Sequence, residues 1–594
     1  MPSKAILLLL TILLACKGKT DLPEGATELI GENTPVSAFK LDNRSIQYDF
    51  GTMHFIREDH PEFDSTITVT CNKMTIMDWD LLVTCPVKRS LQAGDIIYIE
   101  FYGKALHPKK GTAIGQVMFR YASLIFPVIL DTTWKKYSSY AIVKQNVNPS
   151  DLWIHCSFEP QSISLAGIKL FQFNTSTDVS KFKNLTPLYT SDGSWEATAD
   201  KRIDSLRKGQ ASFVLRDDHG EPLPGCAYQV EMIRHAFKFG TAIDPNLITG
   251  NTENAEKYRN ILKQNFNHVV FEDHLKWLTW NNKEERRKAM LALKWLENNE
   301  FIVRGHTLVW PWFDFPWKLI ELNFDTLALK TSILDHLTEK ASILEGRLID
   351  WDVLNEPFVI RNKPHKDNSG VWLYKNVCEV VGEEEVIRWY NKAHEIDPKA
   401  RLFINDYDMV ADGGNFEQHK DDFEAFIAML IENQVPLGGI GFQGHFEGYL
   451  TRPDRVYEVI DRFAKFNLPI LITEFDTDIS NGHDDELYQF THDFLKICFS
   501  HPNIDGFLNW GFWAGKHWKP DAAFYDKDWN LRTNGKAWRD LIYHEWWTFE
   551  EGKTGNKGEV SFKGFLGDYR LTFMQNGKNM ERIFSLGRDG VIWK

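Results

Sequence analysis

The sequence predicts an α/β protein in which a (β/α)8 TIM barrel follows an N-terminal, jelly-roll-like β-sandwich, with small β segments as accessories. Three observations lead to this prediction. The chain has 594 residues, which is too long for a single hydrophobic core unless part of it is a large barrel. Strand-like and helical patterns alternate over residues 238–545. Over residues 36–185 the sequence contains only short, alternating, strand-like runs.

The barrel prediction depends on eight strand-like runs separated by helical stretches. Apolar residues recur with the 3.6-residue spacing of a helix most clearly over residues 283–299 and 454–466. Eight alternations of this size are typical of a (β/α)8 barrel, although periodicity alone leaves a doubly wound sheet open. The eight runs are HAFKFGTAI, HVVFED, IVRGHTLVW, LIDWDVLNE, RLFINDYD, GGIGFQGHF, PILITEFD and IDGFLNWGF.

The N-terminal region, residues 36–185, contains runs such as GDIIYIEFYG and AGIKLFQFN, broken by Asp, Asn, Gly and Pro. Strands at such spacing predict a β-sandwich. The order of the runs resembles that of jelly-roll carbohydrate-binding modules. This resemblance implies a glycan-binding module, and the alternative is a sandwich that only spaces or braces the rest of the chain. The candidate exposed aromatic residues for glycan binding are Trp134, Tyr137, Tyr140 and Trp153.

Three shorter segments complete the predicted organisation. Residues 186–200 form a polar link, and residues 201–237 contain strand-like runs around a turn at DDHGEPLPG, which predicts a small β segment. The barrel is expected to occupy residues 238–545, and residues 546–594 are expected to form a C-terminal β accessory segment.

The N-terminus predicts export. In residues 1–15 a single Lys precedes an apolar run that is too short to span a bilayer, as in a signal peptide. The sequence LLAC that ends at Cys16 resembles the lipobox of bacterial lipoproteins, in which Cys16 would carry the lipid and residues 16–35 would form a polar tether. We therefore expect a cell-surface or outer-membrane lipoprotein, and the alternative is ordinary cleavage and secretion.

Charge and cysteine content exclude several classes of protein. The formal net charge of -14 argues against nucleic acid as a partner, because the chain has no basic stripe to neutralise phosphates. Six cysteines follow Cys16 without CxxC spacing, so neither a zinc site nor a dense disulfide framework is predicted. Cys71 and Cys85 could pair across a hairpin, and two buried thiols are the alternative.

Polar residues stand at the carboxyl ends of the predicted barrel strands. Catalytic groups gather at this end of a (β/α)8 barrel. A buried apolar strand does not normally end in an unpaired carboxylate, because removing a charge from water is costly. Two such strands here end in Glu356, within WDVLNEP, and in Glu474, within LITEFD. The polar strand ends are Glu272, His306, Glu356, Asp406, Gln443 with His445, Glu474 and Trp510.

These motifs closely resemble those of the family 10 glycoside hydrolases, which are mostly endo-β-1,4-xylanases. WDVLNEP and LITEFD match the acid/base and nucleophile signatures of that family. Four further motifs occur in the same order, and the resemblance covers about residues 201–545. The four are GHTLVW (305–310), INDYD (404–408), GIGFQGH (439–445) and WGFWAGKHW (510–518).

The resemblance implies roles for individual residues. Glu356 would be the general acid/base and Glu474 the nucleophile, which requires a raised pKa for the first carboxyl group and an ionised second one. His445, with Gln443 beside it, would hydrogen-bond the nucleophile, and Asn355 would contact the 2-hydroxyl group of the sugar at the cleavage site. No metal and no cofactor is implied.

The same resemblance implies a sugar-binding surface. Apolar ring faces suit the C–H faces of a pyranose, and charged side chains can bind its hydroxyl groups; core packing is the alternative reading of each aromatic residue. Trp510 and Trp518 would close over the sugar, His306 and Trp310 would line the glycone side, Tyr407 would lie near the aglycone side, and Glu272 and Lys276 would bind hydroxyl groups.

The sequence also departs from the family pattern. Family members commonly read ENEMKW where this chain reads EDHLKW, so that Asp273 replaces an amide and His274 follows it. An ionised Asp accepts hydrogen bonds but cannot donate them, which puts the second glycone subsite in doubt. Pro311 stands where the family often has His. Because Glu356 and Glu474 are both present, the departures concern the substrate and leave the predicted reaction unchanged.

The sequence therefore predicts a retaining, endo-acting glycoside hydrolase that cleaves internal β-1,4 linkages of xylan with two glutamates. One alternative is a non-catalytic surface protein that binds polysaccharide. Another is the same type of enzyme acting on a different β-glycan, such as a mixed-linkage glucan. The expected partner is xylan or a related plant or algal β-glycan, and contact with a membrane is expected only through a lipid anchor.

Overall fold

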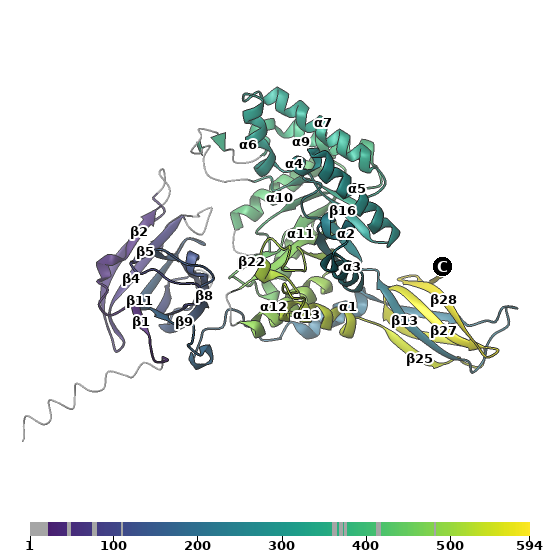
Figure 1. Cartoon of the computed structure of the whole chain (residues 1–594), viewed down its shortest axis with the longest axis horizontal. Coiled ribbons are helices and arrows are strands. Elements are labelled where there is room, and N and C mark those ends of the chain that lie inside the picture. Colours follow the sequence, from purple (N-terminus) through teal and green to yellow (C-terminus); the bar gives the residue numbers. More distant parts are fainter. Residues whose placement is uncertain are drawn as a thin grey trace, which may run out of the picture. The chain divides into compact units, whose positions relative to one another are not determined.

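A computed structural model describes residues 22–43, 49–73, 80–108, 111–358, 365–366, 372–373, 377–411, 417–479 and 483–594 (Figure 1). The described chain forms two compact units, of which the first ends at Leu188 and the second begins at Tyr189. The predicted signal peptide and Cys16 lie outside the described residues. In the described part of the chain, no helix is long and apolar enough to cross a membrane.

The first unit contains two antiparallel β-sheets that share one hydrophobic core, as the sequence predicts for this region. Alternate residues of one strand, such as Leu81, Val83 and Cys85, point into that core. The first sheet has the order β3-β4-β11-β6-β9, with β1 paired to β11, and comprises β1 (Thr27–Ile30), β3 (Gly51–His60), β4 (Phe63–Cys71), β6 (Ile96–Leu106), β9 (Lys135–Ile142) and β11 (Gln161–Phe173). The second has the order β2-β5-β10-β7-β8 and comprises β2 (Lys40–Asn43), β5 (Leu81–Val87), β7 (Ala113–Phe119), β8 (Leu124–Leu130) and β10 (Ser150–His155).

Two of the four candidate glycan-binding aromatics of this unit are buried. Tyr137 and Tyr140 are each 5% exposed. Tyr140 stacks on Phe182, which belongs to the segment after β11 and joins a second apolar cluster on this sheet. The expectation that these two tyrosines are exposed is therefore wrong. Trp134 and Trp153 remain half-buried, and the Trp134 indole N–H donates to Glu58 at 2.8 Å.

The cysteines of the described residues are free thiols. Cys71 and Cys85 are both buried, and burial raises the pKa of each thiol to about 11. The sequence left open a disulfide between Cys71 and Cys85 or two buried thiols, and the structure contains two buried thiols.

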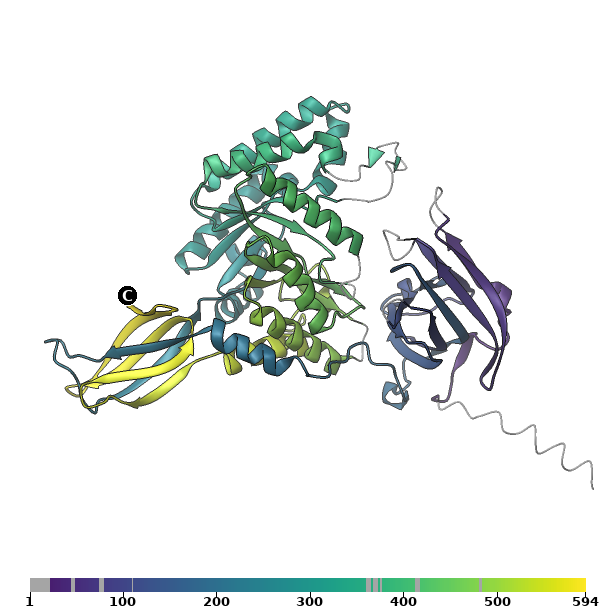
Figure 2. The same cartoon turned by 180° about the vertical axis from the view of Figure 1, so that it is seen from behind.

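The second unit is built around a closed barrel of eight parallel strands (Figures 1 and 2), which confirms the predicted (β/α)8 fold. Each predicted strand-like run contains one barrel strand. The order is β14-β15-β16-β17-β20-β21-β23-β24, with β21 paired to β23, β14 paired to β24, and β22 added beside β23. The strands are β14 (Lys238–Ile243), β15 (His268–Phe271), β16 (Ile302–Val309), β17 (Asp350–Asn355), β20 (Arg401–Asp406), β21 (Leu437–Phe442), β22 (His445–Glu447), β23 (Ile470–Asp478) and β24 (Ile504–Asn509).

Helices cover the outside of the barrel, and local sequence signals explain where several of them begin. Thr252, Asn282 and Asp325 cap the first turns of α3, α5 and α7 through their side-chain oxygens. The helices after β14 to β16 are α2 (Pro245–Thr249), α3 (Glu253–Asn265), α4 (Trp277–Asn281), α5 (Lys283–Asn298), α6 (Pro311–Glu321) and α7 (Thr326–Leu344). Those that follow are α8 (Val377–Val381), α9 (Glu383–Ile396), α10 (Glu417–Glu432), α11 (Pro453–Ala464), α12 (Asp484–Ser500) and α13 (Thr533–Arg539), and β18 (His365–Lys366) pairs with β19 (Trp372–Leu373).

The segments on either side of the barrel differ from the simplest reading of the sequence. The expected polar link ends in a helix, α1 (Glu196–Leu206), because Ala199 and Ile203 are buried and the helix lies against α12. Arg207 follows it and donates to three backbone carbonyl groups, those of Phe499, His501 and Ile504.

The two predicted β accessory segments form joint sheets. Figure 1 shows β13 among the yellow strands of the C-terminal region. One sheet has the order β25-β13-β27-β28-β29, and a second pairs β12 with β26. A lone hairpin is marginally stable in water, so this pairing gives each segment a partner. The strands are β12 (Lys208–Val214), β13 (Ala227–His235), β25 (Phe549–Lys553), β26 (Glu559–Phe565), β27 (Gly567–Gln575), β28 (Lys578–Gly587) and β29 (Gly590–Trp593).

Charged side chains fill part of the barrel interior. Arg304, Asp350 and Asp352 are fully buried. Arg304 donates to Asp350 at 2.9 Å and to Asp352 at 2.5 Å. Asp350 also accepts from Arg401 at 2.9 Å, and Arg401 binds Asp505, which in turn accepts from Lys238 at 2.6 Å. These ion pairs connect five strands of the barrel.

Candidate active site

All the predicted strand-end residues lie at the carboxyl ends of the barrel strands or in the loops that follow. Parallel strands present these ends at one side of the barrel, so residues that are far apart in the sequence meet there. Glu272 and Lys276 follow β15, His306 lies within β16 and Trp310 follows it, Asn355 ends β17 and Glu356 follows it, Asp406 ends β20 and Tyr407 follows it, Gln443 and His445 follow β21, Glu474 lies in β23, and Trp510 and Trp518 follow β24.

Glu356 sits directly after β17 with a φ of 50°. This left-handed conformation is uncommon for a residue other than glycine, and it occurs often at functional sites. The carboxylate accepts from Trp310 Nε1 and from Gln443 Nε2, each at 2.9 Å. Burial raises the pKa of Glu356, and the negative charge of Glu474 adds to the rise against the opposing effect of the two hydrogen bonds. Glu356 is thus suited to carry a proton.

Glu474 has the opposite environment. It is 4% exposed, and its carboxylate accepts from Asn405 Nδ2 at 2.7 Å and lies 3.2 Å from His445 Nε2. Burial alone would raise the pKa of Glu474, but the hydrogen bond from His445 and the electrostatic interactions with His306, His445 and Lys276 outweigh it and lower the pKa. The arrangement keeps this carboxylate ionised.

His445 lies between two carboxylates. Its Nε2 faces Glu474, and its Nδ1 is 3.0 Å from Asp476 Oδ1. Burial disfavours the charged ring, but Asp476 and Glu474 together raise the pKa of His445 to about 9. The imidazolium therefore balances a pair of negative charges at neutral pH. Asp476 also accepts from the Trp518 indole N–H at 2.6 Å.

Three amide side chains connect the two glutamates. Gln443 Nε2 donates to Glu356 at 2.9 Å and approaches Asn355 Oδ1 at 3.5 Å. Asn405 Nδ2 donates to the same Asn355 oxygen at 2.8 Å and to Glu474 at 2.7 Å. Asn405 was not among the residues predicted from the sequence, although the INDYD motif contains it. The structure shows that it is fully buried directly before the polar strand end Asp406.

His306 extends the site into the barrel interior. Its Nδ1 lies 2.9 Å from Asp352 and 3.9 Å from Glu474. Its ring meets Trp510 edge to face at a centroid distance of 5.2 Å. His306 therefore contacts both the nucleophile candidate and the buried ion pairs beneath it.

The predicted sugar-binding aromatics differ in their surroundings. Trp310 is half-buried and Trp510 is 5% exposed, whereas Trp518 is 51% exposed and meets the His445 ring edge to face at 4.9 Å. These three rings lie beside the two glutamates or beside His445. Tyr407 is different, because its hydroxyl donates to the Phe358 carbonyl group at 2.8 Å and its ring packs on a buried histidine.

The residues of EDHLKW separate into two groups. Lys276 Nζ donates to Asp273 at 2.8 Å and lies 5.0 Å from the centroid of the Trp310 ring. Burial and the neighbouring Asp273 raise the pKa of Glu272 to about 7. His274 is bound to Glu285 of α5 at 3.0 Å. Of the two departures in this motif, Asp273 contacts a predicted sugar-binding residue and His274 does not among the described contacts. The third departure, Pro311, is the first residue of α6.

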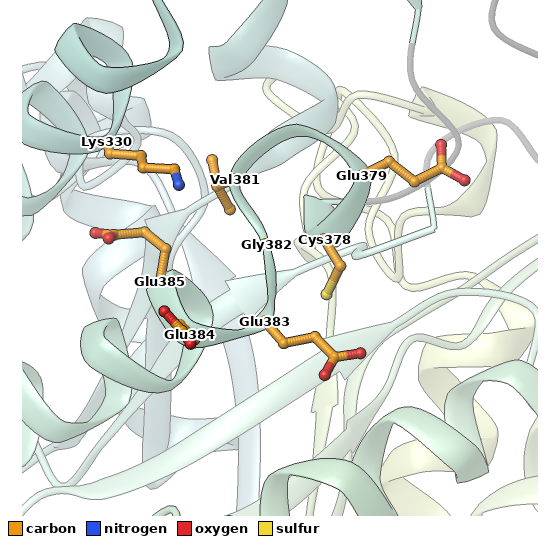
Figure 3. A pocket seen from close by; sticks show the side chains of 8 residues that line it. All are labelled: Lys330, Cys378, Glu379, Val381, Gly382, Glu383, Glu384 and Glu385. Carbon is orange, nitrogen blue, oxygen red and sulfur yellow. The ribbon is translucent and has the colours of Figure 1, made fainter.

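No group of three or more His, Cys, Asp or Glu side chains in the described ranges could hold a metal ion. Figure 3 shows a pocket between α7 and the start of α9, lined by Lys330, Cys378, Glu379, Val381 and residues 382–385. Most of its polar groups are carboxylates, and no predicted site residue lines it.

Two glutamates with opposite electrostatic surroundings, Glu356 half-buried and Glu474 buried, lie at the strand ends of a (β/α)8 barrel and define the glycoside hydrolase class of site. Residues 229–539, slightly more than half of the chain, match the model of glycosyl hydrolase family 10. The chain belongs to this family.

Individual relatives are more distant. The chain is 29% identical over 404 residues to the anti-sigma-I factor RsgI6 of Acetivibrio thermocellus, covering 66% of this chain and 48% of that protein. It is 23% identical over 451 residues to endo-1,4-beta-xylanase 1 of Arabidopsis thaliana, covering 75% of this chain and 43% of that protein. The chain thus spans about half the length of these curated relatives. The crystal structure of xylanase 10B from Thermotoga petrophila RKU-1 with xylobiose is similar at 26% identity and a TM-score of 0.45, over 52% of this chain and 95% of that one.

The charge on His445 predicts a pH dependence of stability. Because its pKa is about 9 in the folded protein and about 6.5 when unfolded, the stabilisation is fully present below pH 6.5 and is lost as the pH rises through 9. The melting temperature of the wild-type protein should fall more between pH 6.5 and 9.5 than that of His445→Gln, measured by calorimetry. Equal falls in the two proteins would contradict the assignment of a charged His445.

Proposed function

We propose that this protein is a retaining endo-β-1,4-xylanase that uses Glu356 as general acid/base and Glu474 as nucleophile. The observation that carries the proposal is the opposite shift of the two pKa values, upward for Glu356 and downward for Glu474. A double displacement requires one protonated and one ionised carboxyl group in the same site. Membership of glycosyl hydrolase family 10 and the names of the xylanase relatives support xylan as the substrate.

The proposed reaction has two steps. Glu474 attacks the anomeric carbon while the glycosidic C–O bond breaks and the proton of Glu356 passes to the leaving oxygen. Water then attacks the same carbon, the bond to Glu474 breaks, and Glu356 takes the proton of the water. Asn355, bound to Asn405 and facing the site, is placed to contact a sugar hydroxyl group.

The remaining side chains of the site would bind the polymer. Trp310, Trp510 and Trp518 offer ring faces, and Glu272 and Lys276 offer polar groups beside Trp310. His445 would support the nucleophile through its hydrogen bond, and Gln443 would hold the acid/base. Tyr407 is held by its own hydrogen bond to the backbone, so its proposed part on the aglycone side is limited to ring contact.

Replacing the nucleophile tests the reaction. Glu474→Ala should lower kcat by several orders of magnitude while xylan binding survives, because the nucleophile acts mainly in the chemical step. Azide should restore turnover and form a glycosyl azide of inverted configuration, which product analysis by NMR detects.

The control for this experiment is Glu432→Ala, because Glu432 is an exposed carboxylate at the end of α10. It should retain wild-type activity in the same reducing-sugar assay. Near-normal activity of Glu474→Ala without azide would mean that the nucleophile is misassigned. Inactivity of the wild-type protein on xylan, mixed-linkage glucan and other plant and algal β-glycans would favour a non-catalytic binding protein.

We also propose that the N-terminal sandwich binds glycan through Trp134 or Trp153, the half-buried candidates. In the Glu474→Ala background, which prevents digestion, the full chain should be retarded in a gel that contains xylan. Replacing both tryptophans by Ala should reduce the retardation. The control variant Trp518→Ala changes the candidate active site and thereby distinguishes xylan binding by the barrel from xylan binding by the sandwich. Unchanged mobility of the double tryptophan variant would leave the module as a spacer.

Export as a lipoprotein, through Cys16, is the third part of the proposal. One acyl chain binds a membrane marginally, whereas several chains anchor a protein firmly. The mature protein should partition into detergent with the cell envelope, and Cys16→Ser should release it or block its processing. Wild-type protein that is soluble in the medium, with an N-terminus beyond Cys16, would instead mean plain secretion.

A further inference from the structure

A buried lysine, Lys340 of α7, lies behind the site and has no part in the proposed reaction. It is fully buried, and its ammonium group donates to the backbone carbonyl groups of Leu275 at 2.6 Å and Thr307 at 2.9 Å. A buried ammonium group is costly unless hydrogen bonds and an opposite charge compensate for it. The carbonyl groups supply hydrogen bonds but no charge.

Asp314 of α6 is a second buried ionisable residue that the proposed reaction does not use. Asp314 is 2% exposed, and burial raises the pKa of Asp314 and lowers the pKa of Lys340, each against the attraction between the two groups. Its Oδ2 accepts from the backbone N–H of Trp310 at 3.1 Å. Trp310 is the residue that caps α6, and its own side chain makes no capping hydrogen bond. Asp314 therefore fixes the backbone of Trp310 from within the first turns of the helix.

These two residues hold the parts of the site nearest to Glu356. Lys340 binds the loop after β15, next to Lys276, and also binds β16 three residues before Trp310. Lys276 lies 5.0 Å from the Trp310 ring, and the Trp310 indole N–H donates to Glu356 at 2.9 Å. A continuous set of contacts thus runs from Lys340 and Asp314 through Trp310 to the proposed acid/base.

We propose that Lys340 and Asp314 position Trp310 against Glu356, Asp314 through its hydrogen bond from the Trp310 backbone N–H and Lys340 through its hydrogen bond to the Thr307 carbonyl group. The proposal rests on the proposed acid/base role of Glu356, and it adds two positioning residues that do not contact the substrate. A hydrogen bond to a carboxylate favours its ionised form. A loosened Trp310 should therefore let the pKa of Glu356 rise further, so that the general acid stays protonated to higher pH.

The charged groups around each member of this set are known. Electrostatic interactions act on Glu356 from Glu474 of β23 and His306 of β16, and on Asp314 from Lys340 and Lys276. Lys340 interacts electrostatically with Glu339 and His336 of its own helix. A change that is confined to Asp314 leaves the first two neighbours of Glu356 in place. Its effect on Glu356 must then pass through Trp310.

The first test uses the pH dependence of kcat/KM on xylan. Asp314→Ala removes the acceptor for the Trp310 N–H, and the basic limb should move upward by about half a pH unit or more, as expected for one weakened hydrogen bond to a charged group. Asp314→Asn keeps an acceptor oxygen and should leave the limb near its wild-type position. Asp335→Ala, an exposed carboxylate on α7, is the matched control and should leave it unchanged.

A double-mutant cycle separates positioning from general damage. Trp310→Phe should shift the limb upward by itself, and Asp314→Ala added to Trp310→Phe should give no further shift. Lys340→Met should behave as Asp314→Ala does, and if it does not fold, the comparison of Asp314→Ala with Asp314→Asn still decides. Shifts that add independently of Trp310, or no shift in Asp314→Ala, would overturn the proposal.

The second test does not require activity. In protein labelled with 5-fluorotryptophan, the ¹⁹F resonance of Trp310, assigned from its absence in Trp310→Phe, should titrate with Glu356 and stop doing so in Glu356→Gln. Its midpoint should be higher in Asp314→Ala. An unchanged midpoint would overturn the positioning role. A shifted midpoint with an unchanged basic limb would support positioning and reject Glu356 as the acid/base.

Discussion

The pairing of charges inside the barrel is the constraint on which the rest of this site depends. Removing an ion from water costs several kcal/mol even after the protein relaxes, so each charge in the interior needs a partner of opposite sign. Arg304, Asp350 and Arg401 are direct neighbours in the register of three adjacent strands, β16, β17 and β20. Opposite charges therefore alternate across the inner face of the barrel. A shift of any of these strands by two residues would separate the partners.

This set of charges ends at Glu356 and Glu474. Asp352 binds Arg304 below and His306 above, and His306 lies 3.9 Å from Glu474. On the other side, His445 stands between Glu474 and Asp476. Glu474 thus lies among positive groups, whereas Glu356 receives only neutral donors from Trp310 and Gln443. Burial raises the pKa of both carboxyl groups. The net pKa shifts are nevertheless opposite, because the hydrogen-bond and charge partners of the two groups differ.

Much of this could be predicted from the sequence, and the reasons are local. The eight strands are short apolar runs between amphipathic helices, so their number and order follow from patterning, and buried strands that end in carboxylates indicate a site. The role of Asn405 could not be read in this way, because its partners lie 50 and 69 residues away. The burial of Tyr140 was also missed, because the cover comes from Phe182 on a segment without regular strand pattern. A local sequence pattern also cannot predict that strands before the barrel pair with strands after it.

The two departures in EDHLKW, Asp273 and His274, fall outside the hydrogen-bonded core of the site, whereas Pro311 directly follows Trp310 at the start of α6. His274 turns to Glu285 on α5, and Asp273 binds Lys276, but neither contacts Glu356, Glu474 or the amides between them among the described contacts. The ammonium group of Lys276 contacts both Asp273 and the Trp310 ring. The charge of Asp273 therefore partly compensates the charge of this ammonium group, which could otherwise bind a sugar hydroxyl group. Binding of the sugar at this edge can therefore change without any change in the two glutamates. Under the proposed function, the chemistry depends on charges held inside the barrel, whereas the choice of polymer depends on loops that the barrel only supports.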